Sequence, residues 1–353
     1  QHRYFGGADT PRGAFMFEIG NEMSHDYARG REEKAFTIAQ YASNAAPYVD
    51  AIRGASPHQV KIALASAVNI YWGAQAGWAQ RGEMVRSLIR EADAHDFRFD
   101  ALQAHLYPSW PVSEPLAGNA YSEGFLTQVL IPVLDQEASS PNADLELWND
   151  ELHAASGSTN RNTGLYGALF QADATVLAFR TSRHGKQLIP VITDFGWWHA
   201  GTNYDSLYFQ DNDASKKTPI YHFRRMLAST WGDWVLPTTV EGVGAWTDAG
   251  QDGQTTTVSN LSAASAMSAD GDTLTLLVVN RSNTDEQVMI RTDGFTAGRV
   301  ASLKRIEGTI KKRQAWDAAW NQIVLREGDA VDLTAAVSFP KASISFLTIR
   351  RAK

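Results

Sequence analysis

The chain of 353 residues contains no cysteine, which excludes disulfide bonds and thiolate metal sites. No stretch approaches the roughly 18 consecutive apolar residues of a membrane-spanning helix. Positive charge is the scarcer sign, with 32 lysines and arginines against 39 aspartates and glutamates and a net charge of −7. The basic footprint of a nucleic-acid-binding protein is therefore missing. We expect neither nucleic acid nor a membrane among the partners of this chain.

Residues 1–25 also lack the basic and apolar regions of a signal peptide. Because Gln1 need not be the first codon of the gene, secretion, the periplasm and the cytoplasm all stay open as locations. What the chain does contain is enough apolar material for a large core, with 44% hydrophobic and 20% charged residues. Its length indicates two domains, or one large domain with an appendage. The 11 tryptophans and 11 tyrosines suit both core packing and the stacking of sugars.

Residues 14–230 alternate between short apolar runs and amphipathic stretches. Within residues 31–54, for example, Ala42, Ala45 and Val49 recur at spacings of three and four, which predicts a helix with one apolar face. Five strand–helix units in series predict a parallel sheet covered by helices. The expected strands are residues 14–19, 60–67, 99–108, 145–151 and 188–196, and the expected helices are residues 31–54, 80–95, 119–138, 161–184 and 217–230.

The pattern changes after about residue 233. Residues 273–280, TLTLLVVN, follow a DGD turn and alternate as a β-strand does, and residues 287–291 can pair with them across a loop. Patterns of the β type continue to the end of the chain. We therefore expect a partial (β/α) barrel domain over residues 1–233 and an antiparallel β-sandwich domain over residues 234–353.

Polar side chains stand at the carboxyl ends of the expected strands. In a parallel barrel these ends meet at one mouth, where catalytic residues lie. Two carboxylates from different strands are what retaining glycoside hydrolysis requires, since one protonates the leaving oxygen and the other attacks the anomeric carbon. The strand-end residues are Asn21, Glu22, His105, Tyr107, Asp150, Glu151 and Asp194, with His153, Trp197 and Trp198 close behind them.

Three of these strand ends carry a family likeness. The motifs GNE after the first strand, HLYP two strands later, and a glutamate at the next strand end resemble clan A glycoside hydrolases. The expected sandwich, with TLTLLVVNRS, and the stretch TPIYHFRRML are similar to the α-L-arabinofuranosidase and heparanase-like branches of that clan. The resemblance covers residues 14–353. It implies an incomplete (β/α)8 barrel, strands four to eight, followed by an all-β antiparallel sandwich.

The resemblance also implies the catalytic roles. Glu22 matches the acid/base and Glu151 the nucleophile, while Asn21 matches the asparagine that contacts the sugar 2-hydroxyl. Tyr107 matches a tyrosine that hydrogen-bonds the nucleophile. The implied activity is that of a retaining glycoside hydrolase such as an α-L-arabinofuranosidase, and it needs no cofactor and no metal ion.

Further residues are expected to bind the carbohydrate. Trp197 or Trp198 matches the aromatic floor of the sugar site in the resembling families. His105 and His153 are candidates for binding substrate hydroxyls, although His105 and Tyr107 also suit positions in the core. The sugar itself stays open among arabinofuranosides, xylosides, galactans and uronides, as does exo or endo action.

Two assignments near the site keep alternatives. The run WNDELH has no aromatic residue directly after Glu151, so Asp150 competes with it as nucleophile, and adjacent strand residues face opposite sides. Glu18 shares the strand parity of Glu22. We expect it one layer deeper, as the partner of a buried arginine or histidine.

If GNE closes strand four of a barrel, three βα units are missing upstream, which leaves open sheet edges. We expect another polypeptide, most simply a second copy of the chain, to complete the barrel. A removed N-terminal piece held non-covalently and an open sheet are the alternatives. Because losing three strands removes part of the mouth, a non-catalytic carbohydrate-binding protein derived from a glycosidase is the second candidate function.

Overall fold

The computed structural model describes residues 15–20, 37–56, 59–65, 78–106, 123–152, 164–194, 217–249, 255–308 and 323–352. These residues fall into two compact units. The first unit holds the described residues up to Leu106, those between Ser122 and Asp150, and Leu188–Val191. The second holds the described residues from Glu151 to Gln187 and from Ile192 onward. The expected domain division after residue 233 stays a prediction.

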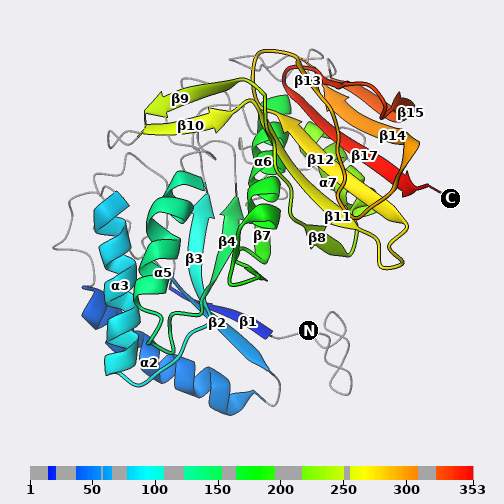
Figure 1. Ribbon diagram of the computed structural model, residues 1–353. Helices are drawn as coiled ribbons and strands as arrows, with labels where there is room; N and C mark the ends of the chain where they lie inside the picture. The colour runs from blue at the N-terminus through cyan, green and yellow to red at the C-terminus, as the bar shows by residue number, and fades with distance from the viewer. Residues whose placement is uncertain are drawn as a thin grey trace. The chain divides into compact units, whose positions relative to one another are not determined.

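A parallel sheet of five strands forms the half-barrel (Figure 1). Its strands pair in chain order, namely β1 (Phe15–Ile19), β2 (Val60–Ala65), β3 (Ala101–Leu106), β4 (Glu146–Leu152) and β7 (Val191–Asp194). Because neighbouring strands run in the same direction, their carboxyl ends lie along one edge of the sheet. The fold class predicted from the sequence, a partial barrel followed by a β domain, is confirmed.

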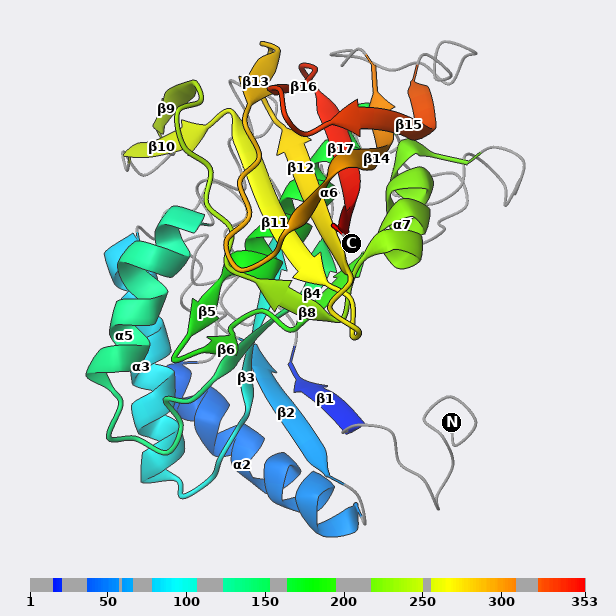
Figure 2. The ribbon, with the colours of Figure 1, turned by 45° about the vertical axis from the view of Figure 1, so that its right-hand side comes forward.

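Three helices of the first unit, α2 (Ile38–Ala55), α3 (Trp78–Ala94) and α5 (Ile131–Gln136), lie on the same side of its strands (Figures 1 and 2). Helix α2 begins after Thr37, whose hydroxyl accepts a hydrogen bond from the Gln40 backbone while the Gln40 side chain accepts one from the Thr37 backbone. This capping box satisfies backbone donors that a helix start leaves open. On the apolar face that the sequence predicted, Ala42, Ala45 and Val49 are buried.

The helix predicted over residues 119–138 changes type along its length. Leu126–Leu130 form a π-helix, η2, in which the Ile131 backbone N–H donates to the Leu126 carbonyl, and α5 follows directly. Pro132, at the start of α5, has no N–H to donate to the preceding turn, so the hydrogen-bond ladder is interrupted there. Among the described residues, no helix is long and apolar enough to cross a membrane.

The second unit is built on an antiparallel sheet of six strands, in the order β15-β14-β17-β12-β11-β8. These strands are β8 (Trp234–Leu236), β11 (Leu261–Met267), β12 (Thr273–Asn280), β14 (Ala297–Glu307), β15 (Val324–Asp332) and β17 (Ser343–Arg351). Three two-stranded sheets accompany it, formed by β5 (Ser182–Arg183) with β6 (Lys186–Gln187), β9 (Ala245–Ala249) with β10 (Thr255–Ser259), and β13 (Glu286–Val288) with β16 (Val337–Phe339).

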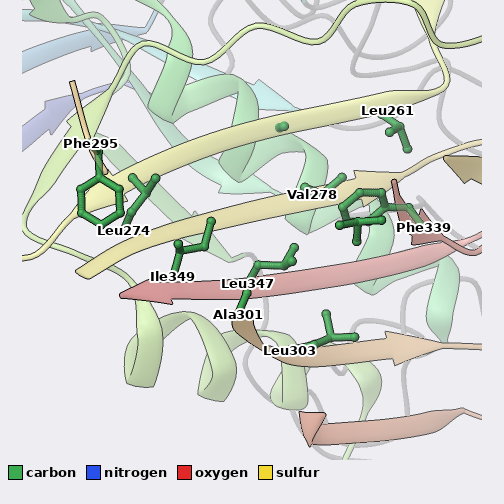
Figure 3. Packing of buried hydrophobic residues seen from close by; sticks show 11 residues of the cluster. Leu261, Leu274, Val278, Phe295, Ala301, Leu303, Phe339, Leu347 and Ile349 are labelled. Atoms are coloured by element: carbon green, nitrogen blue, oxygen red, sulfur yellow. The ribbon is translucent and has the colours of Figure 1, made fainter. Parts of the chain in front are cut away.

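The predicted pairing of residues 273–280 with residues 287–291 is wrong. Residues 273–280 form β12, which pairs with β11 on one edge and β17 on the other. Both edges of β12 are thus occupied by β11 and β17, which are longer than β13. Gln287 and Val288 of β13 pair with β16 instead. The core of the sandwich lies between these layers. Figure 3 shows Phe339 next to Val278, and Phe295 next to Leu274.

Helices α6 (Leu165–Arg180) and α7 (Pro219–Thr230) pack on the opposite face of the six-stranded sheet. The Phe223 ring of α7 stacks on the Phe346 ring of β17 with centroids 6.2 Å apart, whereas the adjacent Leu347 belongs to the sandwich core. The sequence predicted an amphipathic helix over residues 161–184, but α6 is buried at every position from Leu165 to Ala178 and therefore has no solvent-facing side there.

Candidate active site on the half-barrel

One face of the sheet in the first unit carries polar side chains from alternate strand positions. Successive residues of a strand point to opposite faces, so residues two apart share a face. We call this the polar face. Its members are Glu18 on β1, Lys61 on β2, Gln103 and His105 on β3, and Glu146 and Asp150 on β4. The intervening positions, such as Ile62, Leu64 and Leu102, are buried apolar residues.

The deeper part of the polar face is closed by one large side chain. Trp148 packs against Ala63, Ala101 and Val191, and only 1% of its surface is exposed. Its indole Nε1 donates to Glu146 Oε2 at 2.9 Å, and Glu146 forms an ion pair with Lys61. This layer satisfies the polar atom of a buried indole and gives the residues above it a rigid floor.

His105 and Asp150 meet nearer the carboxyl ends of β3 and β4. His105 Nε2 lies 3.5 Å from Asp150 Oδ1, and the two side chains are 0% and 7% exposed. At this separation the carboxylate attracts a protonated imidazole, although the two atoms do not form a hydrogen bond. The structure thus places His105 in a buried, polar setting, while Tyr107 and Pro108 of the HLYP motif lie outside the described residues.

Glu18 reaches the same group from β1. Gln103 Nε2 donates to Glu18 Oε2 at 3.4 Å. Partial burial, followed by the negative charge of Asp150, raises the pKa of Glu18 to about 7, while the charge of His105 and the Gln103 hydrogen bond act in the opposite direction. The sequence predicted that Glu18 is the partner of a buried arginine or histidine, and it did not predict the influence of the Asp150 carboxylate.

A tyrosine on α2 holds the ends of the first two strands together. The Tyr41 hydroxyl donates to the Ile19 carbonyl at 2.5 Å and accepts from the Ala65 backbone N–H at 2.8 Å. Burial raises the pKa of Tyr41 above its usual range, so the hydroxyl keeps its proton as the donor to Ile19. Gly20 follows with φ of 85°, a left-handed conformation that explains the glycine of the GNE motif.

Most of the predicted site residues cannot be compared with these contacts. Asn21, Glu22, Tyr107, His153, Trp197 and Trp198 lie outside the described residues. The backbone of Glu151 belongs to β4, but its side chain is not among those described. His105 and Asp150 are described, and the structure brings them together. The roles assigned to all of these residues stay predictions.

The residues that the sequence analysis overlooked have a recognisable signal. Lys61, Gln103 and Glu146 interrupt strands that are otherwise apolar, and all three contribute to the polar face. Tyr41 gave no such signal, because a tyrosine on the apolar side of a helix is ordinarily a core residue. Among the described residues, no group of three or more metal-ligating side chains could hold a metal ion.

A cavity of about 520 Å³ in the second unit is a weaker candidate site. It lies against the sandwich core, and its lining combines aliphatic side chains with Phe295 and Phe339 and with charged residues such as Arg291 and Asp293. None of the described strand-end motif residues lines this cavity. His105 and Asp150 of those motifs lie on the polar face, and we therefore treat it as the candidate active site.

Solved structures of glycoside hydrolases share the fold of this chain. The half-barrel of five parallel strands with a following β domain matches the fold of clan A glycoside hydrolases, as the motifs in the sequence suggested. The α-L-arabinofuranosidase of Thermotoga maritima, solved as an arabinose complex, matches with a TM-score of 0.69 and 18% identity, over 98% of this chain and 68% of its own. The GH51 α-L-arabinofuranosidase of Thermotoga petrophila matches with a TM-score of 0.69 and 19% identity, over 99% of this chain and 69% of its own.

A second glycosidase family shares the fold more distantly. The GH44 xyloglucanase of Paenibacillus polymyxa, solved with xyloglucan, matches with a TM-score of 0.52 and 13% identity, over 99% of this chain and 69% of its own. No protein-family model and no curated protein matches the chain. At such identities the likeness shows the fold, and the activity has to be derived from the site and tested.

Proposed function

We propose that the chain is a retaining glycoside hydrolase that acts on α-L-arabinofuranosides or closely related glycosides. The observation that carries the proposal is the order of the motifs on the half-barrel. Strand β1 leads into GNE, β3 carries the histidine of HLYP, and β4 ends in WNDE. The solved structures with this fold include α-L-arabinofuranosidases, one of them bound to arabinose.

In the proposed reaction Glu151 is the nucleophile and Glu22 the acid/base. The Glu151 carboxylate attacks the anomeric carbon while Glu22 donates its proton to the glycosidic oxygen, so the leaving group departs as an alcohol. Glu22, now ionised, then takes a proton from a water molecule, whose oxygen attacks the anomeric carbon and displaces Glu151. The sugar leaves with its original anomeric configuration, and Glu22 is protonated again.

The remaining predicted residues bind the sugar in this proposal. Asn21 contacts the 2-hydroxyl, Tyr107 hydrogen-bonds the nucleophile, and Trp197 or Trp198 supports the ring. His105 and His153 supply hydrogen bonds to other hydroxyls. The Asp150 contact suits His105 for this work, because an oriented imidazole can donate or accept at a fixed point.

Activity on aryl α-L-arabinofuranosides tests the assignment. Glu151→Ala is expected to abolish turnover, and added azide should restore it with an inverted product. Glu22→Ala should impair substrates with poor leaving groups most, by about 10²–10⁴-fold. Glu83→Gln, a change on the exposed side of α3, serves as the control. Full activity in either glutamate variant would overturn the roles.

The same assay decides between Asp150 and Glu151. In a strand that alternates regularly, only one of two adjacent residues lies on the polar face, and Asp150 contacts His105 there. Glu151 therefore needs a local break in the alternation at the end of β4 to act beside Asp150. If azide rescues Asp150→Ala with an inverted product and leaves Glu151→Ala inactive, then Asp150 is the nucleophile.

A non-catalytic carbohydrate-binding protein is the second candidate. The observation that favours it is the sheet of five strands, because a complete barrel has eight strands around its mouth. Glycan binding by the wild type, together with no turnover of any aryl glycoside in the screen, would support this alternative and exclude the first.

We also propose that a second copy of the chain covers the β1 edge. Among the described residues, strand β1 ends the order of the sheet and pairs with β2 alone, and its Met16 and Phe17 are 47% and 40% exposed. An open strand edge with apolar side chains favours pairing with another chain. Light scattering after size exclusion should give a dimer for the wild type and a monomer for Phe17→Glu. A monomeric wild type would exclude the proposal.

A further inference from the structure

We propose that Tyr41 is a positioning residue of the half-barrel. Its buried hydroxyl fixes the carboxyl end of β1, where the chain leads into the GNE motif, and it thereby orients the acid/base of the proposed reaction. In the proposed function, on which this inference rests, Glu22 of that motif is the acid/base. Tyr41 itself touches no substrate in this proposal, because it acts through the backbone of Ile19.

One pair of backbone groups closes the β1–β2 ladder at its carboxyl end. Strand β1 ends at Ile19, and β2 ends at Ala65. The Phe15 N–H donates to the Gln59 carbonyl at 2.9 Å, and further along the strand Ile19 pairs with Leu64. Because the hydrogen bonds of a parallel pair repeat at every second residue, the Ile19 carbonyl faces the Ala65 N–H. These two groups form the last rung of the ladder, at the edge of the sheet where the candidate active site lies.

Tyr41 bonds to both groups of this last rung. Its hydroxyl donates to the Ile19 carbonyl at 2.5 Å and accepts from the Ala65 N–H at 2.8 Å. Only 6% of Tyr41 is exposed, and a buried hydroxyl is costly unless it is hydrogen-bonded. A phenylalanine ring would fill the same space, so the two bonds are what the hydroxyl adds to the packing. They fasten the strand ends at the mouth, where the catalytic residues of a parallel barrel lie.

Helix α2 holds the ring of Tyr41 in place. The capping box of Thr37 and Gln40 fixes the first turn of this helix, and Tyr41 follows directly. On the same side of the helix, Ala45 and Val49 are each only 1% exposed. Because the ring is anchored by a capped and buried helix, it cannot easily follow the strand end if that end moves. Tyr41 therefore gives β1 a fixed point of attachment.

The residue after Ile19 shows what this attachment controls. Gly20 has φ of 85°, a conformation that glycine adopts without strain. Glycine also permits many other conformations, so the direction of the turn needs an external constraint. Because a peptide group is planar, the bond that holds the Ile19 carbonyl also orients the Gly20 N–H and the path by which the chain leaves the sheet. Glu22 is only two residues further along the sequence.

Amide NMR spectra of Tyr41→Phe test the clamp, because this variant loses the hydroxyl and keeps the ring. We expect the Gly20 amide signal to shift, since its N–H shares a peptide group with the Ile19 carbonyl. The Ala65 N–H should exchange faster with solvent, because it loses its acceptor. Tyr48→Phe is the matched control. It makes the same chemical change on α2 at a residue that is 64% exposed, and it should alter neither signal.

Kinetics on two aryl glycosides of the sugar that the wild type hydrolyses test the positioning role. The value of kcat/KM reports the steps up to departure of the aryl group, and phenol needs a proton from the acid/base, whereas dinitrophenol leaves without one. Tyr41→Phe should lower kcat/KM about 10–100-fold for the phenyl glycoside and less than about threefold for the dinitrophenyl glycoside. Gly232→Ala destabilises the second unit by a backbone collision, and it should leave the ratio of the two values unchanged.

Three results would count against the positioning role. An equal loss on both substrates in Tyr41→Phe, or no loss on either, would overturn it. An unchanged Gly20 signal together with unchanged exchange at Ala65 would also overturn it, because the clamp would then not exist. A wild type that hydrolyses no glycoside would defeat the proposed function and with it the role assigned to Tyr41, whereas the two NMR readouts would still report the clamp.

Discussion

The buried ion pair between Asp173 on α6 and Arg281 after β12 should be a principal stabilising contact of the second unit. Arg281 Nη1 lies 3.1 Å from both oxygens of the Asp173 carboxylate, and its Nε donates to the Ser259 carbonyl at 2.7 Å. The two side chains are only 4% and 1% exposed. We predict that Asp173→Ala leaves the Arg281 guanidinium in the interior with no compensating carboxylate.

The magnitude follows from this burial. Removing one partner of a buried ion pair costs about 3–5 kcal/mol, because the remaining charge is neither hydrated nor paired. A second cation adds to this cost. Burial, and to a smaller extent the charge of Arg281, lowers the pKa of Arg180 to about 10, so Arg180 is a second cation near the pair. We therefore expect Asp173→Ala to reach the upper part of the range.

Urea unfolding monitored by circular dichroism measures the free energy of unfolding. Hydrogen exchange of the α6 amides measures the local stability of the helix that carries Asp173. The double variant Asp173→Leu with Arg281→Met removes both charges, so it should recover at least about 2 kcal/mol of the loss. Arg299→Met provides the control, since it removes a pair in which the arginine is 74% exposed, and it should cost less than about 1 kcal/mol. If Asp173→Ala lowers the free energy of unfolding by less than about 1 kcal/mol, the reasoning is refuted, because water would then hydrate the Arg281 guanidinium.

Three further substitutions test local features of the fold by urea unfolding. Tyr41→Phe should cost about 1–3 kcal/mol, because the buried Ala65 N–H loses its acceptor, and exchange at Ala65 should accelerate; unchanged exchange would contradict the strand clamp. Gly232→Ala should cost about 1–3 kcal/mol, since the added Cβ would lie 2.6 Å from the Met267 backbone; a neutral effect would mean that this backbone yields. Thr37→Ala should cost about 1 kcal/mol through the lost cap, and Thr37→Ser should retain most of it.

The sequence predicts the sheet of the first unit well. Short runs with apolar residues at successive or alternate positions, bounded by polar and turn residues, are typical of strands even where one face carries charged side chains. The expected strand at residues 14–19 appears as Phe15–Ile19, and the one at residues 145–151 as Glu146–Leu152. The β12 strand was also located correctly, but its partners were not, because a strand pattern carries no information about which strand lies beside it.

The site is less predictable, since it depends on contacts between distant segments. The position of His105 on a strand end follows from its motif, but its partner Asp150 comes from the next strand. Glu18 and Asp150 belong to β1 and β4, which are not neighbours in the sheet, so no local pattern predicts that the charge of Asp150 acts on Glu18. The burial of helix α6 on all sides was not predicted for a similar reason. Its burial results from packing against other elements and not from the periodicity of its own sequence.

The packing of Trp148 against Ala63 and Ala101 has a consequence for how this protein can vary. The three positions share one volume, since the indole fills space that two methyl side chains leave on neighbouring strands. A smaller residue at position 148 would open a void, and a valine at position 63 or 101 would collide with the indole. Compensated pairs, such as Trp148→Leu with Ala101→Val, should therefore be tolerated better than either change alone. In homologous chains we expect bulk to move among these three positions while their combined volume stays nearly constant.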